Sequence, residues 1–246
     1  MKIPSLKNHP FAVETWFESS LVLTYAVQKE EFENLIPECL TLDTFNDKWA
    51  FVAIALVQTK DLRPKGFPSF LGNNFFLAGY RIFVRYTNNR GKRLRGLYIL
   101  KSETNKSKMA FLGNIFTHYN YTTTDISLLN TKERIQIKSK KSELEIDVQL
   151  NNNAGLPKNS PFKDWKEARR FAGPLPFTFT YHKETKEVLI IEGVRRNWIP
   201  QPVEVLNAQV GFLNQKKFKT IALANCFIIE NIPYYWKKGK VEIWKG

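Results

Sequence analysis

Cysteine and histidine are scarce in this 246-residue chain, and their scarcity excludes several classes of site. The two cysteines, Cys39 and Cys226, lie far apart and form no C-x-x-C pair, which predicts buried, unreactive thiols rather than a zinc site. The three histidines, His9, His118 and His182, show no metal-ligand spacing. We therefore predict no metal site.

Signatures of the large cofactor-dependent enzyme classes are also missing. The chain contains no Walker loop, no G-x-G-x-x-G, no G-x-S-x-G and no H-E-x-x-H, so no cofactor is expected. It has no run of 18 apolar residues that could span a bilayer, and its N-terminus lacks the apolar core of a signal peptide. We expect a cytoplasmic protein with no membrane partner.

Basic residues, in contrast, are abundant: 37 lysines and arginines against 23 acids give a formal charge of +14. Such a charge attracts nucleic acid, anionic membranes or acidic ligands. The basic residues are dispersed, and the densest cluster, Lys138 to Lys141, is followed at once by acids at positions 143, 145 and 147. This dispersal favours a solvated basic surface over a nucleic-acid footprint.

The apolar residues, 43% of the chain, are mostly spaced as in β-strands. From Thr15 to Val27 they occupy every second position, the period of a strand with one buried face. Comparable patterns predict further strands at residues 40–45, 50–58, 75–86, 94–103, 134–139, 144–150, 177–181, 188–194, 203–212, 221–229 and 241–244.

Only three helices are predicted, at residues 28–36, 105–116 and 160–173, with Asn105 and Ser160 as capping residues. About a dozen strands exceed what an open, twisted sheet holds without curling or closing. We therefore predict one domain, residues 1–246, that is mainly β with a few short helices (α+β), built as a closed or split β-barrel. The Pro- and Gly-rich loop at 63–74 either covers a cavity mouth or packs on the outside.

Charged residues inside apolar strands are the first candidate ligand-binding residues. On the strand at 94–103, Lys101 and Glu103 continue a row with Leu97 and Ile99. If that row faces the barrel interior, burial would favour a neutral Lys101, an imine-forming nucleophile or a cationic anchor with Glu103 as its partner. The alternative is an ordinary solvent-facing ion pair at a strand end.

Arg81 and His118 complete the candidate set. Arg81 shares its strand face with Leu77 and Phe83, so it either grips a carboxylate or lays its stem across a surface ring. His118 follows a predicted helix within the polar and aromatic segment 117–124. It is either a ligand-binding group or a hydrogen-bonded histidine at a helix end. No residue is assigned a catalytic role.

Six stretches carry a resemblance to a known family. They read LIPECLTLD at 35–43, WAFVAIALV at 49–57, RPKGFP at 63–68, YRIFV at 80–84, GLYIL at 96–100 and PQPVEV at 200–205. In these stretches the chain resembles the YqjF-like family of domains of unknown function, in the acetoacetate decarboxylase-like superfamily. The resemblance spans most of the chain and implies a cone-shaped β-barrel with a central cavity.

The resemblance does not extend to the decarboxylase nucleophile. Decarboxylases of that superfamily form an imine through a lysine in a Gly-Phe-Pro-Lys-Lys motif directly after a helix, where the second lysine lowers the pKa of the first. The corresponding stretch here runs from Ile115 to Tyr119 and contains no lysine. Glu103 resembles an acidic position that relatives carry on the preceding strand. The missing lysines speak against decarboxylation by the family mechanism.

Two functional hypotheses follow, with a third open. The first is a domain that binds a small organic molecule, with a carboxylate as one option, in the barrel cavity near Arg81, Lys101, Glu103 and His118. The second is a basic, non-catalytic module that binds nucleic acid or an anionic surface. The third is a homo-oligomer that pairs edge strands within 134–150, although the charges there equally suit protection against pairing.

Overall fold

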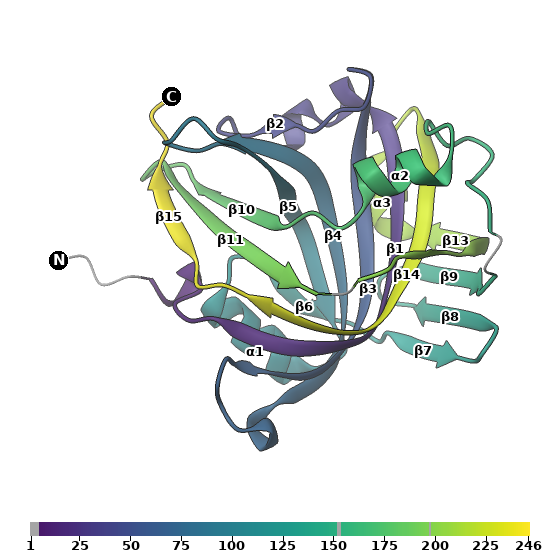
Figure 1. Cartoon of the computed structure of the whole chain (residues 1–246), viewed down its shortest axis with the longest axis horizontal. Coiled ribbons are helices and arrows are strands. Elements are labelled where there is room, and N and C mark those ends of the chain that lie inside the picture. The colour runs from purple at the N-terminus through teal and green to yellow at the C-terminus, as the bar shows by residue number, and fades with distance from the viewer. Residues whose placement is uncertain (1–4, 152–153, 197) are drawn as a thin grey trace.

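The computed structural model describes residues 5–151, 154–196 and 198–246, and strands dominate it (Figure 1). An eleven-stranded mixed sheet contains a ring of seven strands, because the last of these seven strands also pairs with the first. This ring-like pairing agrees with the predicted closed or split barrel. Its strands, in order of pairing, are β14 (Ile221–Trp236), β1 (Val13–Gln28), β3 (Trp49–Pro64), β4 (Asn73–Thr87), β5 (Arg93–Thr104), β10 (Phe177–His182) and β11 (Glu187–Arg195).

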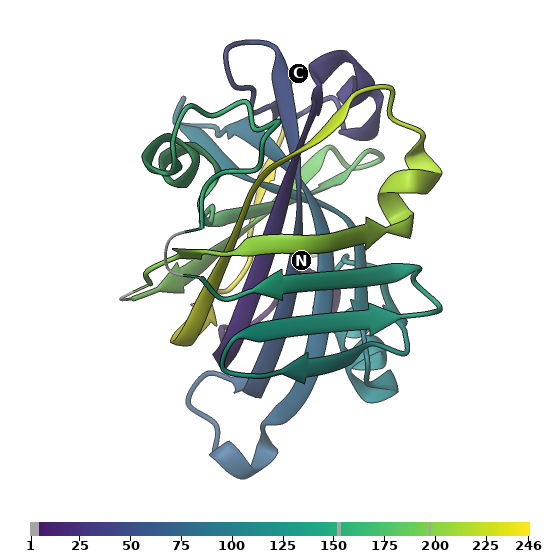
Figure 2. The ribbon, with the colours of Figure 1, turned by 90° about the vertical axis from the view of Figure 1, so that its right-hand side faces the viewer.

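Short strands extend the ring at its margins. β15 (Lys240–Ile243) pairs with β11, β12 (Gln201–Pro202) with β14, β2 (Thr41–Leu42) with β4, and β6 (Tyr121–Thr123) runs parallel to β5. A separate four-stranded sheet lies across the outer face of the ring (Figure 2). Its order is β13 (Glu204–Val210), β9 (Leu144–Gln149), β8 (Arg134–Ser139) and β7 (Ser127–Asn130).

The main hydrophobic core lies between this second sheet and the ring. Ile54 and Ile82 of the ring belong to the same buried cluster as Ile137 and Ile146 of the second sheet. The opposite face of each ring strand points into the ring. Strand β3 is therefore buried on both faces, which explains why residues 50–57 are continuously apolar instead of alternating.

The helices depart from the predicted pattern in four places. α1 (Ser107–Phe116) and α2 (Trp165–Ala172) form near the predicted positions, but residues 28–36 form two 3-10 turns, Lys29–Glu31 and Glu33–Leu35. The predicted strand at 203–212 gives way to α3 (Gly211–Lys216) at its end. Two further 3-10 turns are Leu6–Asn8 and Ser69–Leu71.

Both predicted capping residues have other partners in the tertiary structure. The Asn105 side chain accepts a hydrogen bond from the Phe76 amide at 2.8 Å, and the Ser160 hydroxyl donates to the Ala224 carbonyl at 2.7 Å. Helix α2 is capped instead by Asp164. Long-range contacts thus override local capping signals.

One strand prediction also changes. Of the predicted strand at 40–45, only β2 forms and pairs with β4, and a single bridge joins Phe45 to Trp49. In the loop at 63–74, the side chains of Phe67 and Phe70 are exposed. In the described part of the chain, no helix is both long and apolar enough to cross a membrane.

Candidate functional site

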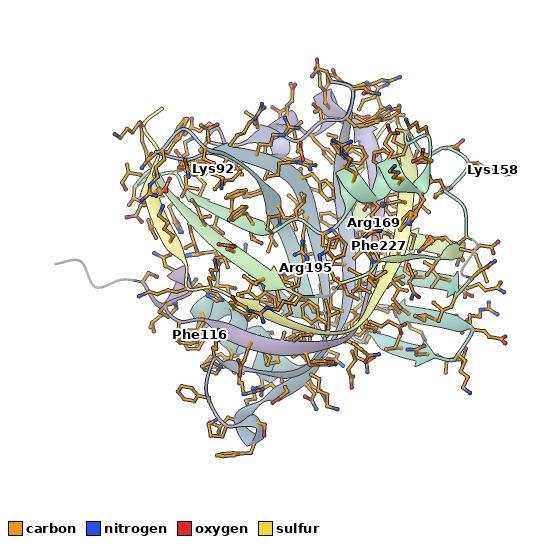
Figure 3. The ribbon with its side chains drawn as sticks, viewed as in Figure 1. Lys92, Phe116, Lys158, Arg169, Arg195 and Phe227 are labelled. Carbon is orange, nitrogen blue, oxygen red and sulfur yellow. The ribbon has the colours of Figure 1, made fainter. Side chains whose placement is uncertain are left out.

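A cavity of about 120 Å³ lies inside the ring. Its walls are inward-facing side chains of β1, β3, β4, β5, β10 and β14, and residues 172–175 at the end of α2 close one side. Most of the lining is apolar. Arg195 and Phe227 both line the cavity, and Figure 3 shows Arg195 near the middle of the ring and Phe227 beside β14.

Two arginines line this cavity without a counter-ion. Arg81 comes from β4 and Arg195 from the end of β11, and the Nε of each is buried and has no hydrogen-bond partner. Among the described residues, no aspartate or glutamate lines the cavity. Both side chains are half-buried, and a buried donor without a partner is costly, so this pair creates a local preference for an anion.

Arg195 is held in place by neutral oxygens. Its Nη2 donates to the Pro174 carbonyl, and its guanidinium also hydrogen bonds to Tyr234. Burial lowers the pKa of Arg195, whereas Tyr234 raises it. The guanidinium therefore gains no charge neutralisation from these neutral contacts.

Two glycines leave space for these side chains, Gly79 for the guanidinium of Arg81 and Gly193 for Tyr234, the partner of Arg195. A Cβ on Gly79 would lie 2.8 Å from Nη2 and 2.9 Å from Nε of Arg81, so this guanidinium lies directly over the glycine. A Cβ on Gly193 would lie 1.9 Å from the hydroxyl of Tyr234, the residue that bonds Arg195. Each arginine follows its glycine by two positions, and such residues share one face of a strand.

Three tyrosines add polar groups to the cavity: Tyr119, Tyr121 and Tyr234. Burial raises the pKa of all three, to about 12 for Tyr121, and nearby Arg81 opposes that rise. Tyr119 is also hydrogen bonded to Thr178. At neutral pH these side chains are therefore uncharged hydroxyls that can donate to an anion.

A β-bulge decides which side of β5 faces the cavity. Tyr80 pairs with Lys101 but Arg81 pairs with Ile99, so Leu100 is the extra residue. The bulge reverses the alternation, so that Ile99 faces the cavity and Lys101 lies on the outer face. The predicted row that joined Lys101 and Glu103 to Leu97 and Ile99 is therefore wrong.

Lys101 and Glu103 instead join the ring to the segment between β8 and β9. Lys101 Nζ lies 2.8 Å from the Glu103 carboxylate, which also accepts from Tyr80 Oη at 3.0 Å and Ser142 Oγ at 2.7 Å. Glu103 is buried, whereas the Lys101 side chain is one-third exposed. Every charge in this cluster has a partner, which is the arrangement of a structural ion pair.

His118 lies outside the lining of the cavity. Its Nε2 is 3.2 Å from His182 Nε2 and 3.1 Å from Asn8 Oδ1. Burial, His182 and Lys7 lower the pKa of His118 to about 4. The neutral ring thus links the N-terminal segment, the end of α1 and β10.

Sequence reasoning missed Arg195 and Tyr234. Among the predicted candidates only Arg81 reaches the cavity, and the structure brings it together with Arg195 because β11 closes the ring against β14. The paired Gly-x-Arg pattern in β4 and β11 is a signal that was available in the sequence, at 79–81 and 193–195. Groups of three or more His, Cys, Asp or Glu that could hold a metal are absent from the described residues. Cys39 and Cys226 are buried free thiols, as predicted.

The chain belongs to the DUF2071 family, described as an uncharacterized conserved protein, whose family model matches residues 14–239. No curated protein is significantly similar to it. This membership agrees with the predicted resemblance.

Solved structures share the fold at low sequence identity. An acetoacetate decarboxylase from Legionella pneumophila is 11% identical, with 98% of this chain and 92% of that chain covered and a TM-score of 0.59. An acetoacetate decarboxylase-like enzyme from Sphingomonas wittichii RW1 is 10% identical over 99% and 97%, with a TM-score of 0.62. The enduracididine biosynthesis enzyme MppR, complexed with a condensation product of pyruvate and imidazole 4-carboxaldehyde, is 8% identical over 94% and 89%, with a TM-score of 0.53. These likenesses establish the acetoacetate decarboxylase-like fold alone.

Proposed function

We propose that this protein binds a small organic carboxylate inside the ring, through the guanidinium groups of Arg81 and Arg195. The observation that carries the proposal is two half-buried arginines, each with a buried Nε that has no partner, in a cavity that no described carboxylate lines. A carboxylate would supply the missing charge and accept two parallel hydrogen bonds from one guanidinium. The neutral hydroxyls of Tyr119, Tyr121 and Tyr234 can bind its second oxygen.

The size of the cavity supports a ligand of about six non-hydrogen atoms. Its volume of about 120 Å³ is close to the ~150 Å³ that accommodates benzene in an engineered protein cavity. Butanoate and pyruvate both have this size. MppR, which shares the fold, has been solved in complex with pyruvate.

Imine chemistry is not part of the proposal. In the described chain no lysine lines the cavity, and Lys101 is paired with Glu103 on the outer face. The arginines and tyrosines can bind, orient and polarise a carboxylate, but none is a nucleophile of the family type. We therefore propose binding and assign no catalytic residue.

A basic groove adjoins the cavity at residues 173–175, which belong to both. Arg95 in the groove is neutralised by the buried Asp43, at 2.6 Å. The groove contains no described aspartate or glutamate, and its basic residues are Lys92, Arg93, Arg95, Lys166, Arg169 and Arg170. Such a surface concentrates anions at the mouth of a binding site.

The test is calorimetric titration of the full chain with butanoate, pyruvate and the uncharged analogue butanamide. Butanoate or pyruvate should bind, and butanamide should not. Arg81→Ala should weaken carboxylate binding about 100-fold, because a hydrogen-bonded charge pair is lost. Lys101→Ala, on the neighbouring strand but the opposite face, is the matched control and should bind normally. Equal carboxylate affinity in Arg81→Ala would disprove the proposal.

The basic groove also favours a second candidate function, the binding of nucleic acid. If its cations contact phosphates, a short DNA duplex should bind at low salt and dissociate steeply as salt rises. Arg170→Glu should then weaken duplex binding without affecting butanoate at equilibrium. Absence of duplex binding at low salt would rule this candidate out.

A further inference from the structure

A second chamber of about 170 Å³ adjoins the cavity. It lies between α1, the N-terminal residues 9–13 and the ends of β3 and β4. Four residues line both spaces and form the partition between them: Leu77, Tyr119, Tyr121 and Trp236. The two chambers are therefore neighbours that share one wall.

The walls of the second chamber are mostly apolar. Met109, Leu112 and Phe116 of α1 form one side. Two buried polar atoms in this lining nevertheless have no hydrogen-bond partner, Thr59 Oγ1 and His9 Nδ1. Thr59 is 2% exposed and His9 is 7% exposed, so water cannot easily satisfy them from outside. Burial without a partner is unfavourable for such atoms, which makes them candidates for contact with a ligand.

Helix α1 fixes the partition residue Tyr121. The Tyr121 amide donates to Asn114 Oδ1 at 2.8 Å, and Asn114 Nδ2 donates back to the Tyr121 carbonyl at 2.9 Å. The tyrosine ring also occupies the space above Gly113, where a Cβ would lie 2.4 Å from it. The wall between the chambers is thus a side chain on a held backbone, and a side chain can change rotamer without breaking these bonds.

We infer that the ligand is a carboxylate with an extended apolar tail, whose head binds the arginines and whose tail passes Tyr121 into the second chamber to end in a hydroxyl or carbonyl group. This inference rests on the proposed function and names its ligand class. The head requires the two guanidiniums, the tail matches the apolar walls, and the terminal oxygen meets Thr59 and His9.

A chain-length series tests the tail. Calorimetric titration with acetate, butanoate, hexanoate and octanoate should give affinities that rise about fourfold per added methylene up to octanoate, the gain expected from burying each one. An octanoate affinity no higher than that of butanoate would overturn the inference. The proposed function would survive that result if butanoate still binds and Arg81→Ala still weakens its binding about 100-fold.

A bulky substitution in the second chamber gives an independent test. Leu112→Trp should fill the chamber, weaken octanoate binding at least tenfold and leave butanoate unchanged. Phe111→Trp is the matched control, because Phe111 lies on the same helix but is 67% exposed. Circular dichroism verifies that both variants fold. Equal octanoate affinities in the two variants would contradict occupation of this chamber.

The terminal oxygen is tested with 8-hydroxyoctanoate. It should bind the wild type several-fold more tightly than octanoate, because its hydroxyl pairs with an orphan atom of Thr59 or His9. Thr59→Val has nearly the same shape and should reduce that advantage. A wild type that prefers octanoate would overturn the polar end of the proposed ligand while leaving the apolar tail in place.

Discussion

Strands β4 and β5 carry charged side chains on both faces, and the two faces differ in whether these side chains have partners within the protein. On the outer face, Lys101 and Glu103 neutralise each other, and Tyr80 and Ser142 complete the hydrogen bonds of the carboxylate. On the inner face, Arg81 has neither an ion pair nor a hydrogen bond from Nε. In the first arrangement every charge has a partner within the protein, whereas in the second we propose that a bound anion supplies the missing partner.

The presence or absence of a protein partner separates structural charges from candidate ligand-binding charges in this fold. Asp43 is a second structural example, because this fully buried carboxylate lies between Arg85 and Arg95 and is neutralised on both sides. Buried charges that are satisfied by protein partners hold segments together. Those left unsatisfied beside a cavity indicate a ligand.

The largest effect should come from breaking the satisfied cluster. Glu103→Ala should lower the free energy of unfolding by about 3 kcal/mol, because Lys101, Tyr80 and Ser142 lose their shared acceptor. Urea unfolding measures this change, and the variant should bind butanoate with normal affinity while it is folded. A loss of butanoate binding in folded Glu103→Ala would place Glu103 in the ligand site and erase the distinction between the two faces.

The inner face should respond in the opposite way. Arg81→Met should leave the unfolding free energy of the ligand-free protein unchanged or higher, because it removes a half-buried charge whose buried Nε has no partner. Butanoate at 100 times its dissociation constant should stabilise the wild type by about 2.7 kcal/mol, and this gain should vanish in Arg81→Met. Thermal unfolding with and without butanoate gives both quantities. Marked destabilisation of the ligand-free variant would mean that Arg81 has a structural role.

His118 should produce a smaller, pH-dependent effect. Its pKa is about 4 in the folded protein and ~6.5 when unfolded, so between these values the unfolded state binds more protons. Stability should therefore fall as pH decreases from about 6.5 to 4, and His118→Asn should flatten this slope. His9, whose pKa burial also lowers, keeps part of the slope. An unchanged slope in urea titrations of His118→Asn would argue against a neutral, buried His118.

The smallest expected effect concerns imine formation, which we predict to be absent. Borohydride reduction in the presence of acetoacetate should give no mass adduct, because Lys101 is paired with Glu103 on the outer face and no described lysine lines the cavity. Intact-mass spectrometry measures this. An adduct that disappears in Lys101→Ala would mean that Lys101 reaches a keto acid after all.

Much of the fold could be predicted because the relevant signals are local. The strand at β1, the continuous apolar run in β3 and the hairpin of β8 and β9 follow directly from side-chain period. The prediction that β1 has one buried face is wrong, because Ser20, Thr24 and Ala26 on its second face are buried inside the ring. Capping was less predictable, since Asn105 and Ser160 are engaged by distant backbone groups. The pairing of β2 with β4 is likewise a long-range choice that no local pattern encodes.

The sequence alone determined a strand-rich fold built as a closed or split barrel, a missing lysine nucleophile and an arginine among apolar neighbours on β4. Only the tertiary structure decided which charges share a space. One extra residue at Leu100 turned Lys101 away from the cavity, because a shift of one position moves a side chain to the other face of a strand. Closure of the ring by β11 and β14 brought Arg195 to the same cavity as Arg81, a proximity that depends on strand order rather than on any local pattern.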